Sequence, residues 1–139
     1  MKVPVVVEWT QCGVCAVKFS RSGVKLPAPL QKQFVRYFSG KPTTFRVSLD
    51  LAAGTLFQQK VWRVLCSIPY GQTRSYAWVA RKLGKSGAAR AVGTACGANP
   101  VPIIVPCHRV IASDGTLGGY SGGLAWKRRL LRLEGVTLR

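Results

Sequence analysis

The segment that most constrains the fold of this chain runs from Asn99-Pro100-Val101-Pro102 to Pro106. Proline lacks a backbone N–H and disfavours a helical conformation in the residue before it, so this segment must follow an extended path. Between the prolines, the apolar run 103–105 predicts entry into the buried core. A rigid approach therefore leads the chain to Cys107 and to His108, the only histidine in the sequence.

Helices are predicted before this segment. Thr55 and Gln58 match a capping box, and the apolar stripe after them predicts a helix that stops at Pro69. Apolar spacing predicts a second helix over 76–83, closed by a glycine, and a third over 88–96. A short turn joins these last two helices, which is the pattern of a helix-turn-helix motif.

A further helix is predicted after the segment, over 124–134, from its apolar periodicity. We expect its apolar residues to face inward and its cations to face solvent. The inward set is Trp126, Leu130 and Leu133, and the outward set is Lys127, Arg128, Arg129 and Arg132.

The first 50 residues predict a small α/β module. Two apolar runs, 3–7 and 14–19, read as the strands of a hairpin. Apolar residues at helical spacing predict a helix over 29–39 that Gly40 ends. The apolar face of this helix is Leu30, Phe34, Tyr37 and Phe38. The alternation of apolar and polar residues over 45–50 predicts a half-buried strand.

The length of 139 residues allows one ordinary domain or two small packed halves. The Ala-Ala-Gly stretch 52–54 reads as a linker and favours the second arrangement. We therefore expect a small α/β module over 1–53, made of an antiparallel sheet plus a helix. A mainly helical domain over 54–139 then carries the Cys-His pair.

The charge of the chain is very unequal. Twenty-one lysines and arginines face four acids, for a formal net charge of +17. Such a field attracts polyanions, so nucleic acid is the first expected partner and an anionic membrane surface the second. No apolar run approaches the ~20 residues that span a bilayer. The five cysteines are an odd number, which argues against a disulfide framework and favours a reducing, intracellular compartment.

Cys107 and His108 invite a chemical interpretation, because imidazole titrates near neutrality and can take a proton from a thiol. Adjacent residues of a strand point to opposite faces, so direct contact requires a turn or a bridging water. Glu134 lies where the helix macrodipole disfavours a negative charge, so it is a candidate partner for His108. The alternative is that Glu134 pairs with one of the many cations, such as Arg129 or Arg132.

Two further features admit both a structural and a functional interpretation. The helix 88–96 is rich in alanine and glycine, which suits tight core packing or close, sequence-poor contact with DNA, with Arg90 as its one long side chain. Cys12-x-x-Cys15 suggests a metal site, yet structural zinc needs about four ligands and the remaining thiols are scattered. We expect no metal.

Four motifs occur together in this chain: Asn99-Pro100-Val101-Pro102, Pro106-Cys107-His108-Arg109-Val110, Tyr120-Ser121-Gly122-Gly123 and Leu133-Glu134-Gly135. In this order and spacing they resemble the O6-alkylguanine-DNA alkyltransferase family. The resemblance covers residues from about 55 to 135. It implies a ribonuclease-H-like N-terminal module and a winged helix-turn-helix-like domain that carries the active site. Some family members bind zinc in the N-terminal part, but this chain lacks the histidines for it.

The resemblance implies a role for each matching residue. Cys107 is the alkyl acceptor, His108 deprotonates it through a water, and Glu134 orients His108. Asn99 braces the active-site segment, and Tyr76 assists rotation of the nucleotide and donates a proton toward the base. The implied pocket residues are Pro102, Val110, Tyr120, Ser121 and Cys96. The implied DNA contacts are Arg90, which fills the gap left by the flipped base, with Ala89, Thr94, Lys85 and Ser113.

The resulting hypothesis is a DNA repair protein that acts once. It transfers a methyl or other small alkyl group from O6-alkylguanine in duplex DNA to Cys107 after base flipping, with O4-alkylthymine as an open second substrate. It needs no cofactor and acts as a monomer in the cytoplasm, on the nucleoid in a prokaryote. The alternatives are a non-catalytic helix-turn-helix module that senses lesions or regulates, and a cysteine hydrolase with turnover.

Overall fold

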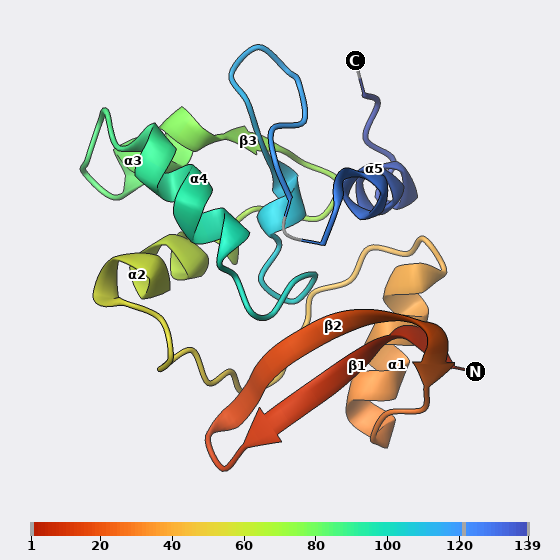
Figure 1. Cartoon of the computed structure of the whole chain (residues 1–139). Coiled ribbons are helices and arrows are strands. Elements are labelled where there is room, and N and C mark those ends of the chain that lie inside the picture. The colour runs from red at the N-terminus through yellow and green to blue at the C-terminus, as the bar shows by residue number, and fades with distance from the viewer. Residues whose placement is uncertain (1, 121, 139) are drawn as a thin grey trace.

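The N-terminal part is a β-hairpin backed by one helix. The structure, a computed structural model, describes residues 2–120 and 122–138. Strands β1 (Val3–Thr10) and β2 (Gly13–Val24) pair antiparallel, and helix α1 (Ala28–Phe38) lies beside them (Figure 1). The predicted hairpin and helix are confirmed, and both strands are longer than the apolar runs from which they were predicted.

The strand predicted over 45–50 is wrong. This segment has no ladder and makes a single parallel bridge, between Leu49 and Val14. The side chain of Gln33, from α1, occupies the backbone groups that a neighbouring strand would need. Its Oε1 accepts from the Arg46 N–H at 2.6 Å and its Nε2 donates to the Arg46 carbonyl at 3.2 Å. The alternation therefore reflects the partly buried side of an irregular segment and not a paired strand.

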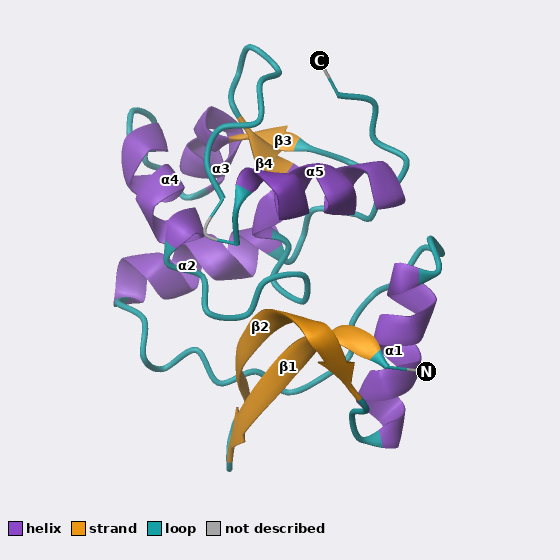
Figure 2. Ribbon diagram, turned by 45° about the vertical axis from the view of Figure 1, so that its right-hand side comes forward, coloured by secondary structure: helices purple, strands orange, loops and turns teal. Residues whose placement is uncertain are grey.

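The remainder of the chain is mainly helical and lies above the hairpin in Figure 2. Its helices are α2 (Leu56–Leu65), α3 (Tyr76–Lys82), α4 (Ala89–Gly97) and α5 (Leu124–Leu133), with a short 3-10 helix η1 (Cys107–Arg109). Two-residue strands β3 (Arg74–Ser75) and β4 (Val110–Ile111) pair in parallel. The chain therefore combines an α/β part with a mainly helical part, as predicted.

Local signals account for most of these helix ends. The capping box that begins α2 is present in full: Thr55 Oγ1 accepts from the Gln58 N–H at 3.1 Å, and Gln58 Oε1 accepts from the Thr55 N–H at 2.9 Å. Gly84 ends α3 with φ +70°, a left-handed conformation that glycine adopts without strain. A six-residue connection then leads to α4, which confirms the predicted helix-turn-helix.

The proline-rich segment is largely buried and contains no helix, but the predicted extended path is wrong at residues 103–104, where the chain makes a turn. The Val105 N–H donates to the Val101 carbonyl across this turn at 2.9 Å, and Asn99 holds its shape. The Asn99 side chain accepts from the Val101 N–H and donates to the Val105 carbonyl, both at 2.9 Å. Between them Ile103 has φ +73°, an unfavourable conformation for a β-branched residue. The segment ends in η1, so Cys107 and His108 lie on a 3-10 turn and not on a strand. The turn that the Cys-His pair requires is therefore present.

One hydrophobic core passes through both parts of the chain. It is built by residues from every major helix and from the hairpin, including Val3, Val5, Phe34, Leu65, Val79, Val92, Val110 and Leu130. Among the residues that the structure describes, no helix is long and apolar enough to cross a membrane.

Lys127 is buried, which corrects its predicted outward position. It falls on the inward stripe of α5 with Leu130, Leu131 and Glu134, at the i, i+3, i+4 and i+7 spacing of one helix face. The prediction was wrong because the charge of Lys127 was taken to indicate exposure to solvent. The ammonium group donates to the carbonyls of three residues in or beside the loop before α5, Val110, Leu117 and Gly119, and is thereby satisfied. Arg128, Arg129 and Arg132 are exposed as predicted, Leu130 is buried, and Trp126 and Leu133 are partly buried.

Lys127→Met is expected to lower the free energy of unfolding by about 3 kcal/mol, because it leaves buried carbonyls without a donor. Urea denaturation measures the change. Arg128→Met, at the exposed neighbouring position, is the matched control and should change stability by less than about 0.5 kcal/mol. Equal effects of the two substitutions would contradict the structural role of the buried ammonium group.

Candidate active site

Cys107 begins the 3-10 turn at the end of the proline-rich segment and is 2% exposed. Burial raises the pKa of its thiol, while the Asn99 side chain and the positive charge of Lys127 act in the opposite direction. The Tyr120 hydroxyl lies beside the thiol without a well-formed hydrogen bond among the described residues. At neutral pH the resting thiol therefore keeps its proton and needs a base to become a nucleophile.

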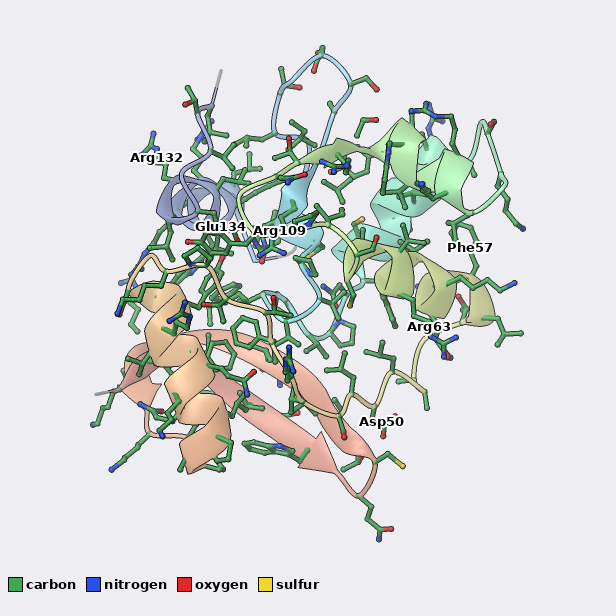
Figure 3. The ribbon with its side chains drawn as sticks, turned by 180° about the vertical axis from the view of Figure 1, so that it is seen from behind. Asp50, Phe57, Arg63, Arg109, Arg132 and Glu134 are labelled. Carbon is green, nitrogen blue, oxygen red and sulfur yellow. The ribbon has the colours of Figure 1, made fainter. Side chains whose placement is uncertain are left out.

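The Glu134 carboxylate gathers the polar groups of the site. Its Oε2 atom accepts from the Tyr37 hydroxyl and from His108 Nε2, each at 2.5 Å, and from Arg109 Nη2 at 3.2 Å. Its Oε1 atom accepts from Arg109 Nε at 2.8 Å and from the Gly71 N–H at 3.0 Å. Figure 3 shows Arg109 and Glu134 side by side in the interior, while Arg132 points outward.

These contacts test the two interpretations of Glu134, which are pairing with His108 and pairing with a cation, and both pairings are present. It pairs with His108, as the chemical interpretation predicted, and also with a cation, which is the buried Arg109 rather than Arg129 or Arg132. The carboxylate sits at the C-terminal cap of α5, where the macrodipole disfavours a negative charge. Its five donors outweigh that penalty.

Glu134 is ionised in the folded protein. Burial alone would raise its pKa, but the hydrogen bonds and charges of His108 and Arg109 prevail and lower the pKa to about 2. Since Arg109 is permanently charged, its contribution holds whatever the state of His108.

His108 is fully buried, and burial lowers the pKa of its imidazole, with the nearby cations Arg109 and Lys127 acting in the same direction against Glu134. The neutral ring must place its single proton on Nε2, because an ionised carboxylate at 2.5 Å can only accept. The free lone pair is then on Nδ1, which has no partner among the described residues. This ring nitrogen is available as a base.

A groove of about 740 Å³ opens next to this site. Its walls come from α3, α4 and the loop before α5, and it brings together six of the predicted site residues: Tyr76, Ala89, Arg90, Thr94, Ser113 and Tyr120. Tyr120 both lines the groove and lies beside the Cys107 thiol. Tyr120 therefore separates the buried thiol from the groove between α3 and α4.

Four of the other predicted residues are buried outside the groove, near η1 or at the end of α4, and Lys85 lies apart from them. Pro102, Val110 and Asn99 are buried in the segments that flank η1, and Cys96 is buried near the end of α4. Lys85 is exposed in the turn before α4, with its Nζ 5.8 Å from the Phe57 ring. Ser121 lies outside the described residues.

Sequence reasoning missed three residues of the site: Tyr37, Gly71 and Lys127. Tyr37 was assigned to the apolar face of its helix. This is correct for its ring, but the apolar pattern gives no information about its hydroxyl group. Lys127 was assigned to solvent by its charge, although its helical spacing with Leu130 and Glu134 places it inward. Gly71 takes part through its backbone, which no side-chain pattern reveals.

A buried cysteine and a buried histidine on one turn, beside a groove between two helices, define the general class of this site, and comparisons with known proteins define the family. The family model described as "6-O-methylguanine DNA methyltransferase, DNA binding domain" matches residues 56–136. The chain therefore belongs to the 6-O-methylguanine DNA methyltransferase family, which confirms the resemblance of its motifs.

Relatives named methylated-DNA–protein-cysteine methyltransferase are similar over most of the chain. The Mycobacterium tuberculosis protein is 59% identical over 102 residues, which are 73% of this chain and 61% of that protein. The inducible protein of Bacillus subtilis is 52% identical over 106 residues, which are 76% of this chain and 59% of that protein. The match thus spans about three fifths of the length of these relatives.

Solved structures are similar as well. The crystal structure of Mycobacterium tuberculosis OGT in complex with DNA matches with a TM-score of 0.85 and 42% identity, covering 96% of this chain and 89% of that one. The Schizosaccharomyces pombe Atl1 structure, in complex with damaged DNA containing O6-carboxymethylguanine, matches with a TM-score of 0.52 and 39% identity. This match covers 58% of this chain and 77% of the Atl1 chain.

Glu134→Gln is expected to weaken the fold and to flatten its response to acid. A carboxyl whose pKa falls from 4.5 to about 2 on folding stabilises the protein above its ordinary pKa, and this stabilisation is lost as the pH falls toward 2. The contribution is about 3 kcal/mol by this linkage. Denaturant titrations between pH 7 and pH 3 should show it in the wild type and not in the variant.

Asp50→Asn is the matched control for this measurement. Asp50 is exposed, and its pKa is lowered by the hydroxyl of Thr10 and the backbone of Ala52 alone. The control should keep most of the acid slope. The same slope in wild type and in Glu134→Gln would show that the carboxylate does not stabilise the fold.

Proposed function

We propose that this protein transfers a methyl or other small alkyl group from O6 of guanine in duplex DNA to the Sγ atom of Cys107, once per molecule. O4-alkylthymine is an open second substrate. The observation that carries the proposal is the buried Cys107 thiol, next in sequence to a neutral imidazole and beside Tyr120, which lines the groove between α3 and α4. The names of the relatives support the same chemistry.

The proton path follows from the tautomer of His108. Nε2–H is held by Glu134, so Nδ1 accepts the Cys107 proton through a bridging water. The thiolate attacks the alkyl carbon, an S–C bond forms, and the bond from that carbon to O6 breaks. Tyr76, whose pKa burial raises to about 12, keeps its proton until it donates it to the departing guanine, and the proton that His108 took from the thiol then returns to the Tyr76 oxygen through solvent. Cys107 ends as a thioether, which explains a single turnover.

Binding to DNA is assigned to the groove between α3 and α4. Small side chains on α4 let the backbone approach the duplex, and Arg90 on the groove wall is long enough to fill the space left by an extruded base. Extrusion costs a few kcal/mol, and a poorly pairing lesion lowers that cost. The net charge of +17 supports a polyanionic partner.

Several finer features belong to the same proposal. The hairpin and α1 correspond to a ribonuclease-H-like module over 1–53, and residues 54–139 to a winged helix-turn-helix-like domain in which β3 and β4 form the wing. The protein works as a monomer in the cytoplasm. The reaction balances with the thiol alone, so the proposal includes no metal or organic cofactor.

Incubation with a duplex oligonucleotide containing O6-methylguanine should add one methyl group to the Cys107 peptide, measured by mass spectrometry. Cys107→Ser should abolish this transfer, whereas Cys66→Ser, at an exposed cysteine, should not change it. Tight lesion binding with unmodified Cys107 would instead support the non-catalytic binding module. Multiple turnovers with a labile intermediate would support a cysteine hydrolase.

Arg90→Ala is expected to slow transfer from duplex DNA by about tenfold to a hundredfold, because the extruded state loses the side chain that replaces the base. Transfer from the same lesion in single-stranded DNA should fall much less. Lys32→Ala, at an exposed position on α1, removes an equal charge and serves as the control. Equal losses on both substrates would contradict a role in extrusion. Single-turnover kinetics make the comparison.

A further inference from the structure

Tyr37 joins the N-terminal part of the chain to the Cys107 site. It lies on α1, is fully buried, and has its ring edge-on to Tyr70 and to His108, at centroid distances of 6.0 and 6.5 Å. Its hydroxyl donates to Glu134 Oε2 at 2.5 Å and lies 3.3 Å from His108 Nε2. Tyr37 and Glu134 are 97 residues apart in sequence.

We propose that Tyr37 is a positioning residue that shares Glu134 Oε2 with His108 and thereby keeps His108 neutral, with its Nδ1 lone pair free. The inference deepens the proposed function, on which it rests, because a neutral His108 is the base of that reaction. Through the hydroxyl group of Tyr37, the N-terminal segment of the chain also contributes to the chemistry.

The sharing follows from the geometry at one oxygen atom. Oε1 is occupied by Arg109 Nε and the Gly71 N–H, so Oε2 must serve Tyr37 and His108 together, with Arg109 Nη2 at the longer distance of 3.2 Å. The Tyr37 hydroxyl and the His108 Nε2–H form the two short hydrogen bonds to Oε2. Each bond weakens the other, because both draw on the negative charge of the same oxygen atom. The stronger the bond from Tyr37, the less negative charge Oε2 presents to the His108 ring.

The Tyr37 hydroxyl can only act as a donor toward Oε2. Burial and the neighbouring Glu134 charge raise the pKa of Tyr37 above its ordinary value, so the phenol keeps its proton. A protonated phenol facing an ionised carboxylate donates to it. The contribution of Tyr37 is therefore a hydrogen bond without a change of net charge.

Three groups act electrostatically on His108, and each of them carries a charge. Glu134 and Lys127 come from α5, and Arg109 follows His108 in η1. Removing any of the three changes the net charge of the buried site. Tyr70 influences the cluster as well, but its hydroxyl donates to the Leu133 carbonyl at 3.2 Å and not to Glu134. Tyr37→Phe therefore isolates a single hydrogen bond, and Tyr70→Phe is its matched control.

The single histidine makes the effect directly measurable. Nitrogen-15 NMR of ring-labelled protein reports the tautomer and the pKa of His108 without any contribution from another histidine. In Tyr37→Phe, the bond from Nε2–H to Oε2 should strengthen. The Nε2 proton should then move downfield, and the pKa of His108 should rise by about half a unit to one unit. In Tyr70→Phe both values should stay at those of the wild type.

The rate of Cys107 methylation should follow the same shift. The acid limb of the pH-rate profile should move to higher pH by the amount that NMR gives, while the affinity for lesion-containing duplex DNA stays unchanged. A purely structural role of Tyr37 would lower the melting temperature and leave the His108 pKa and the acid limb in place. That result would overturn the proposal.

A second substitution reverses the expected sign. Site-specific replacement of Tyr37 by 3-fluorotyrosine keeps the ring and makes the hydroxyl a stronger donor, so the pKa of His108 should fall. It also tests the proposal if Tyr37→Phe folds poorly, and an unchanged or raised pKa would count against it. The NMR result stands even if Cys107 is never methylated, so failure of the proposed function and failure of this inference are distinguishable.

Discussion

The ionised carboxylate of Glu134 is the interaction on which the rest of the site depends. A buried negative charge is costly unless it is paired and hydrogen-bonded, and here Arg109, His108, Tyr37 and Gly71 meet that condition together. These partners come from α1, the turn after α2, and η1, while Glu134 itself caps the end of α5. One carboxylate therefore gathers elements from both parts of the chain and, by accepting from Nε2, sets the tautomer of His108.

The local elements of the fold were predictable because their signals are local. The capping box of Thr55 and Gln58, the glycine that ends α3 and the proline segment before Cys107 each act within a few residues. The pairing of His108 with Glu134 was predicted from their chemistry and from the family motifs, and the role of Cys107 beside them stays a prediction. The structure brings His108 and Glu134 into contact and supplies the turn that the Cys-His pair needed.

What could not be predicted depends on contacts between distant segments. No pattern separates a tyrosine that merely fills a core from one whose hydroxyl meets a carboxylate, so Tyr37 was seen only as an apolar residue. Lys127 was misassigned because its charge was given more weight than its helical spacing. The segment near Arg46 alternates like a strand, yet the Gln33 amide, and no neighbouring strand, occupies its backbone groups.

The left-handed backbone conformation of Ile103 links the shape of the Cys107 site to the complete fold. A left-handed conformation at a β-branched residue costs on the order of 1–3 kcal/mol and persists only where surrounding packing imposes it. Ile103 is buried, four residues before the thiol. In the unfolded chain the segment has no reason to keep this shape, and the imidazole that follows Cys107 is then solvated and not held by Glu134. The buried Cys107-His108 turn with its oriented imidazole is thus a property of the completed fold, and a newly made chain acquires it only when the segment around Glu134 has packed against it.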